Sequence, residues 1–62
     1  MPFIEVTAFE HRFTDESKAK RLIAALTDVI ADTFAEEVRA ETEVVLTGVR
    51  PSRWGFGEEV RG

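Results

Sequence analysis

The N-terminal residues alternate between apolar and polar side chains in the manner of a β-strand. Over residues 2–9 every second side chain falls on the same side of an extended backbone. One side is wholly apolar and carries Ile4, Val6 and Ala8. The other side is mixed and carries Phe3, Glu5, Thr7 and Phe9. The apolar side suits a helix packed on it, and the two phenylalanines indicate that the mixed side is covered as well.

A helical pattern follows after a short break. Residues 10–13 interrupt the alternation and are expected to form a loop. From Asp15 to Phe34 the apolar residues then recur every three or four positions, as Ala19, Leu22, Ile23, Leu26, Ile30 and Phe34, with Ala25 and Val29 widening the stripe. Thr14 or Asp15 can cap the helix, because either side chain accepts hydrogen bonds from the free amides of the first turn.

The second half of the chain predicts another strand and a hairpin. Residues 35–41 form a charged connector, and residues 42–47 alternate again until Gly48 ends the strand. Pro51 marks a turn, and residues 54–60 suit a short hairpin or an edge strand laid on a neighbouring chain. A strand, a long helix and a strand make a β-α-β unit with parallel strands, so the fold class is α/β (α+β) in a single domain over residues 1–62.

The small size of the chain predicts association with a second copy. A domain of 62 residues buries only about 60 % of the surface of its unfolded chain. There is no cysteine and His11 is the sole histidine, which leaves neither a disulfide nor a thiolate or histidine metal cluster to compensate. Two strands also leave both sheet edges open. We expect a dimer with a four-stranded sheet and two helices on one side, and further dimers packed on the opposite face.

Charge and hydropathy limit the class of partner. The net charge of −4 disfavours nucleic acid, because phosphate neutralisation needs a basic surface. No apolar run approaches the roughly 18 residues of a membrane span, and no signal peptide precedes the first strand. A cytoplasmic protein with no nucleic-acid or membrane partner is therefore expected.

Pro2 is the first candidate for chemistry. A small second residue permits removal of Met1, which would leave a free secondary amine at the head of the strand. An N-terminal amine has an ordinary pKa of about 7.7–8.0, which is suitable for proton transfer near neutral pH. The alternative is that Pro2 serves only as a processing signal.

The order of these features resembles the 4-oxalocrotonate tautomerase family. The resemblance runs from Pro2 to about Glu59 and includes Arg12 in the first loop and the segment Pro51-Ser52-Arg53-Trp54-Gly55-Phe56-Gly57. It implies β-α-β units assembled as hexamers, which are trimers of dimers. It also implies a cofactor-free enzyme in which the N-terminal proline moves a proton between the enol and keto forms of a small acid.

The resemblance also implies roles for three residues. Pro2 would act as general base and then as acid. Arg12 would bind the substrate carboxylate through two hydrogen bonds. The alternative interpretation is that Arg12 is a solvated arginine in a loop, with no part in binding. Trp54 would form an apolar wall that helps to keep the amine neutral. The alternative interpretation is that Trp54 anchors a subunit interface.

Glu43 departs from the family pattern. It occupies the position of a second arginine that stabilises enolate charge, so an anion replaces a cation and should repel a dicarboxylate. Arg39, Arg50 or Arg53 could supply the charge instead, or a different subunit could bring it.

Three functions follow from this sequence. The expected one is a tautomerase acting on a 2-keto or 2-hydroxy-dienoic acid. The alternatives are a hydratase or dehalogenase in which Glu43 activates water, and a non-catalytic subunit of a heteromeric assembly.

Overall fold

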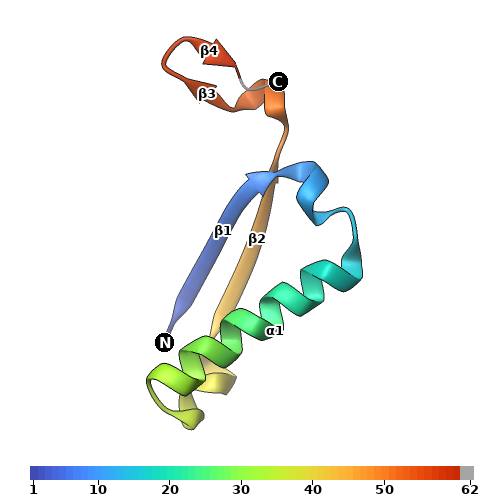
Figure 1. Ribbon diagram of the computed structural model, residues 1–62. Helices are drawn as coiled ribbons and strands as arrows, with labels where there is room; N and C mark the ends of the chain where they lie inside the picture. Colours follow the sequence, from blue (N-terminus) through green and yellow to red (C-terminus); the bar gives the residue numbers. More distant parts are fainter. Residues whose placement is uncertain (61–62) are drawn as a thin grey trace.

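The computed structural model describes residues 1–60, and Figure 1 shows their arrangement. The strands are β1 (Phe3–Phe9), β2 (Glu43–Val49), β3 (Gly55–Phe56) and β4 (Glu59–Val60), and the α-helix is α1 (Glu16–Thr33). Three short 3₁₀ helices, η1 (Glu10–Phe13), η2 (Glu36–Glu41) and η3 (Pro51–Arg53), occupy the predicted loops, connector and turn.

The two long strands confirm the predicted β-α-β unit. β1 and β2 are parallel, with a register that runs from Phe3 opposite Glu43 to Phe9 opposite Val49. β3 and β4 form the predicted antiparallel hairpin. α1 lies along one face of the β1–β2 sheet (Figure 1). The apolar face of β1 is half-buried beneath it, whereas Phe3, Glu5 and Thr7 on the other face are exposed.

The helix begins where its capping residue predicts. Asp15 is the N-cap, and its carboxylate accepts hydrogen bonds from the amides of Ser17, at 2.9 Å, and Lys18, at 3.4 Å. Hydrogen bonds from the Ser17 hydroxyl and amide, followed by that from the Lys18 amide, lower the pKa of the Asp15 carboxyl. This direction is expected because a carboxylate at a helix N-terminus is stabilised in its charged form.

The packing face of the helix differs from the predicted stripe at its edges. Ala31 is the most buried residue, at 3 % exposure, and it was not assigned to the apolar face. Val29 and Phe34 were expected on the apolar face, but their exposures are 59 % and 69 %. The reason is geometric. A two-stranded sheet is narrow, so it covers only the middle of a wide apolar stripe, and the flanking side chains reach past its edges.

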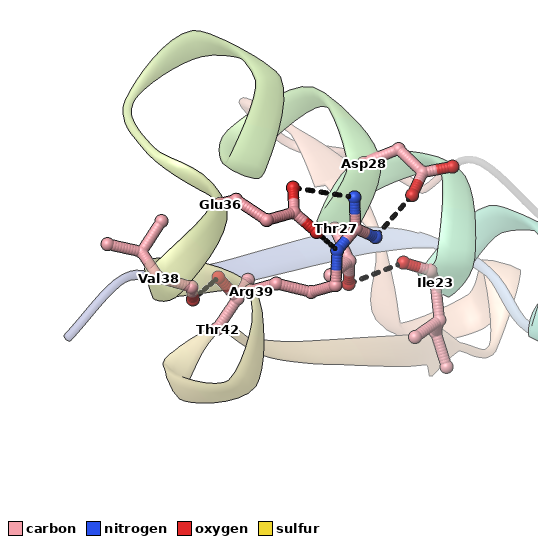
Figure 2. A network of polar contacts seen from close by, with 7 residues as sticks. All are labelled: Ile23, Thr27, Asp28, Glu36, Val38, Arg39 and Thr42. Carbon is pink, nitrogen blue, oxygen red and sulfur yellow. Dashed lines mark hydrogen bonds and ion pairs between the residues drawn. The ribbon is translucent and has the colours of Figure 1, made fainter.

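Arg39 joins the connector to the helix (Figure 2). Its guanidinium donates hydrogen bonds to the carboxylates of Glu36, at 2.7 Å, and Asp28, at 2.5 Å. The hydrogen bond and the positive charge of Arg39 lower the pKa of the Glu36 carboxyl. Close by, the Thr42 hydroxyl donates to the carbonyl of Val38 at 2.8 Å. These bonds hold η2 against the end of α1, at the point where the chain turns into β2.

Gly48 does not end the second strand, as the sequence had suggested. It lies within β2 and is paired with Ala8, and the strand continues to Val49. A Cβ at this position would lie 2.9 Å from the Cα of Glu10 and 3.1 Å from its Cβ. Glycine is therefore needed because the backbone of η1 approaches β2 closely, and η1 carries Arg12.

The chain buries too little surface to be compact by itself. Its radius of gyration is 14.4 Å, whereas a compact chain of this length has about 11 Å. Its accessible surface is 4930 Å², whereas a monomer of this mass exposes roughly 4,000 Å². Ala31 is the sole buried residue in the described part of the chain. The β3–β4 hairpin projects beyond the end of the sheet as an arm (Figure 1).

The close approach at Gly48 gives a prediction about stability. The substitution Gly48→Ala should lower the free energy of unfolding by about 1–3 kcal/mol, because the new methyl group meets the backbone of η1 and not the end of a flexible side chain. Thermal unfolding at a fixed protein concentration measures the effect. Gly55→Ala is the control, because a Cβ there would lie 3.5 Å from its nearest neighbour, an ordinary contact. Equal melting temperatures for the two variants would contradict the steric explanation.

Candidate functional site

A cavity lies at the carboxyl end of β1, where the hairpin leaves the sheet. Its volume is about 350 Å³, and its lining residues are Thr7, Ala8, Phe9, Arg12, Trp54 and Phe56. Three of these are aromatic and one is a cation. The lining comes from three separate segments of the chain, namely β1, η1 and the start of the hairpin.

Local structure fixes the two predicted residues of this cavity. Arg12 lies in η1, which follows β1 directly. Trp54 follows η3, and its amide donates to the carbonyl of Pro51 at 3.1 Å. The rings of Phe9 and Trp54 meet edge to face, with centroids 5.0 Å apart and planes at 75°. Arg12 and Trp54 therefore line one cavity, although 42 positions separate them in the sequence.

Pro2 and Glu43 lie together at the opposite end of the sheet. The amide of Glu43 donates a hydrogen bond of 2.9 Å to the carbonyl of Pro2. Pro2 is half-buried and Glu43 is exposed. The path from Pro2 to Phe9 follows an extended strand, which covers about 23 Å at about 3.3 Å per residue. Within one chain, the four predicted site residues thus form two pairs at opposite ends of β1.

The three arginines considered as substitutes for the missing cation differ in their surroundings. Arg39 is bound to Asp28 and Glu36, and these bonds raise the pKa of its guanidinium, so it is not a free cation. Arg50 and Arg53 line a second cavity of about 450 Å³ together with Glu10, Gly48 and Val49. That cavity lies at the Arg12 end of the sheet, because both arginines follow the end of β2. In the isolated chain, neither is near Pro2.

Charged residues lie at both ends of the sheet. Arg12, Arg50 and Arg53 lie at the carboxyl end of the strands together with Glu10, and the hairpin beyond them carries Glu58 and Glu59. Glu41 and Glu43 lie at the amino end. The three arginines, Glu41 and Glu43 form no ion pair within the part of the chain that the structure describes.

Two aromatic residues of the cavity were not predicted as site residues from the sequence, and neither were Thr7 and Ala8. Phe9 was assigned to the mixed face of the first strand, and Phe56 to the aromatic–glycine segment of the hairpin. Each is an aromatic residue close in sequence to Arg12 or Trp54, but only the folded chain shows that both line the same cavity.

Over residues 1–60, no three His, Cys, Asp or Glu residues are grouped so as to hold a metal ion. In the same residues no helix has the length and apolar character needed to cross a membrane.

Comparison with known proteins identifies the family. Searches of curated proteins and of solved structures gave no significant match. The model of a family described as "Tautomerase enzyme" matches residues 2–62, which is nearly the whole chain. This match agrees with the β-α-β unit and with the resemblance carried by Pro2, Arg12 and Trp54. The chain belongs to the tautomerase family.

Proposed function

We propose that the protein moves a proton between the enol and keto forms of a small 2-keto or 2-hydroxy-dienoic acid. The observation that carries this proposal is the shared cavity of Arg12 and Trp54, because it combines a carboxylate-binding group with an apolar wall. The family match, which starts at Pro2, supports the same chemistry.

Each residue has a distinct part in the proposed reaction. With Met1 removed, the Pro2 nitrogen has a lone pair and accepts the proton of the enol hydroxyl. The resulting ammonium then returns a proton to the carbon that becomes tetrahedral, so the amine ends as it began. Arg12 binds the carboxylate through its planar fork. Trp54 excludes water, which favours the neutral amine between turnovers.

This chemistry requires two chains. A small acid cannot span the distance of about 23 Å between Pro2 and the Arg12 end of the same strand. If two sheets join with their strands antiparallel, the Pro2 end of one chain meets the Arg12 end of its partner. The open sheet edges and the low burial both favour this arrangement. It gives the expected four-stranded sheet and two identical sites per dimer.

A larger assembly would cover the remaining apolar surface. Phe3 and Val45, on the sheet face opposite α1, are 60 % and 42 % exposed. A trimer of dimers, as in the hexamers of the family, would bury this face between dimers. A heteromeric assembly in which another subunit brings a second arginine would bury it in the same way, so Glu43 alone does not decide between the two.

The position of Glu43 restricts the substrate. It lies beside Pro2, to which it is hydrogen-bonded backbone to backbone, and its carboxylate adds a negative charge to this end of the sheet. A second carboxylate on the substrate would be repelled there. A monocarboxylate is therefore the preferred class.

A subunit-mixing experiment tests the divided site. Pro2→Ala and Arg12→Gln should each abolish most ketonisation of phenylenolpyruvate. When the two variants are unfolded together and refolded as a mixture, about a quarter of wild-type activity should return, because half of the dimers are mixed and each mixed dimer has one intact site. Ultraviolet absorbance of the enol follows the reaction.

Two results would contradict this proposal. If the mixture is no more active than the separate variants, then Pro2 and Arg12 do not act together across an interface. If the mass of the purified protein still includes Met1, then Pro2 has no free amine and the proton-transfer role fails.

One observation favours a second candidate function, the addition of water. The backbone hydrogen bond from the Glu43 amide to the Pro2 carbonyl makes the two residues neighbours, and Glu43 is exposed. Such a carboxylate can activate water for attack on an unsaturated acid, while the Pro2 ammonium protonates the neighbouring carbon.

Glu43→Gln separates the two functions. For water addition, the variant should lose release of chloride from 3-chloroacrylate while it retains ketonisation of phenylenolpyruvate, because only the first reaction needs the carboxylate. Glu41→Gln is the matched control, since it removes an exposed carboxylate two residues away. Absence of chloride release from the unmodified protein would exclude this candidate.

A further inference from the structure

We propose that one side of α1 selects the partner in the dimer, and that the partner it accepts is a second copy of the same chain. This inference rests on the antiparallel dimer of the proposed function, though not on its chemistry. It decides between identical and different subunits, which Glu43 leaves open. The residues concerned form a row along the helix that we call the α1 flank: Lys18, Arg21, Leu22, Ala25, Val29 and Asp32.

The first half of the α1 flank is a hollow on the surface of the helix. Its volume is about 270 Å³, and its lining residues are Lys18, Arg21, Leu22 and Ala25. Their spacing is i, i+3, i+4 and i+7, which is that of the four residues around a hole in knobs-into-holes packing. Ala25 leaves the hollow open, because its side chain is a single methyl group. The hollow therefore has the position and shape to receive one side chain from another helix.

A side chain that fits this hollow lies on the same flank. Val29 follows Ala25 by one helical turn and is 59 % exposed, so the single chain leaves it without cover. The centre of the hollow lies between residues 21 and 22. When Val29 of an antiparallel copy occupies it, the two-fold axis passes beside Ala25, and the first copy's Val29 enters the second hollow. Such self-complementarity is what a closed pair of identical chains requires.

The same axis brings opposite charges together at both ends of the flank. Lys18 and Asp32 each lie seven positions from Ala25, so Lys18 of each copy faces Asp32 of the other. Both residues are exposed, and neither forms an ion pair within the described chain. Asp28, by contrast, is already bonded to Arg39. A dimer of this kind therefore has two new pairs of opposite charge.

The joined sheet brings the two helices to packing distance. Each chain contributes two strands and one helix that lies over them (Figure 1). Strands are spaced by about 4.8 Å, so the centres of the two halves of a four-stranded sheet are about 10 Å apart. Packed helices have axes about 8–10 Å apart. Joining the strands antiparallel also makes the helices antiparallel, as the α1 flank requires.

Exchange of charges tests the docking. Asp32→Lys and Lys18→Glu each create two pairs of like charge in the dimer and should raise its dissociation constant about tenfold or more. The double variant Lys18→Glu/Asp32→Lys should regain the association of the unmodified protein, because both pairs are reversed. An equimolar mixture of the single variants should associate as mixed dimers for the same reason. Sedimentation velocity measures the dissociation constant, and native mass spectrometry identifies the mixed dimers.

Two variants are matched controls for charge. Lys20→Glu and Glu37→Lys make the same changes of charge at exposed positions and should leave the dissociation constant unchanged. Lys20 is two positions from Lys18 and therefore faces away from the flank. The test variants should not weaken the helix itself, because they place negative charge in its first turn and positive charge in its last, as the helix dipole favours.

Val29→Ala tests the hollow separately from the charges. The exposed side chain contributes little to the single chain, but each dimer buries two copies of it. Shortening both should raise the dissociation constant about tenfold. Helix content, measured by circular dichroism, should not fall, because alanine has the highest helix propensity.

The results separate this inference from the proposed function. Association that survives both charge exchanges would overturn the inference, as would single variants that neither the double variant nor the mixture rescues. A protein that stays monomeric when purified alone would overturn it in favour of a different partner chain. If the charge exchanges behave as expected but mixed Pro2→Ala and Arg12→Gln chains stay inactive, the proposed function fails and this inference stands.

Discussion

The parallel pairing of β1 with β2 is the constraint from which the rest of the structure follows. Its register places Glu43 beside Pro2 at one end and leads the chain into Trp54 at the other. Because a strand is extended and cannot fold back on itself, the same pairing keeps Pro2 away from Arg12. The proposed proton transfer therefore requires that the two ends belong to different copies of the chain.

The shortage of buried surface points to the same requirement. Marginal stability is usual for small domains, but this chain has a single buried residue among those described and a hairpin that projects beyond the sheet. Apolar side chains such as Phe3, Val45 and Phe34 gain little by folding of the single chain. Their burial between subunits would add hydrophobic stabilisation at about 25 cal/mol per Å². If the chain assembles as proposed, folding and assembly are one process, and its stability depends on protein concentration.

Periodicity in the sequence predicted the elements better than it predicted their surroundings. Strand alternation, helical spacing and the Asp15 cap are local properties, and they located β1, β2 and α1 to within one or two residues. The width of the packing face and the role of Gly48 depend on other segments, so Val29, Phe34 and Gly48 were assigned wrongly. Pro2, Arg12, Trp54 and Glu43 were recognisable by type and order. Their division into two pairs, and the part of Phe9 in the cavity, required the register and the path of the hairpin.

The separation of the two ends of β1 has a consequence for how the protein can change. Residues that share no contacts and lie more than about 10 Å apart usually contribute independently. Within a single chain, substitutions around Arg12, Phe9 and Trp54 therefore leave the surroundings of Pro2 and Glu43 undisturbed. In the proposed dimer the same substitutions would act on the Pro2 end of the other copy. One change in the gene would then alter both sites of the dimer at once, each through a different copy of the chain.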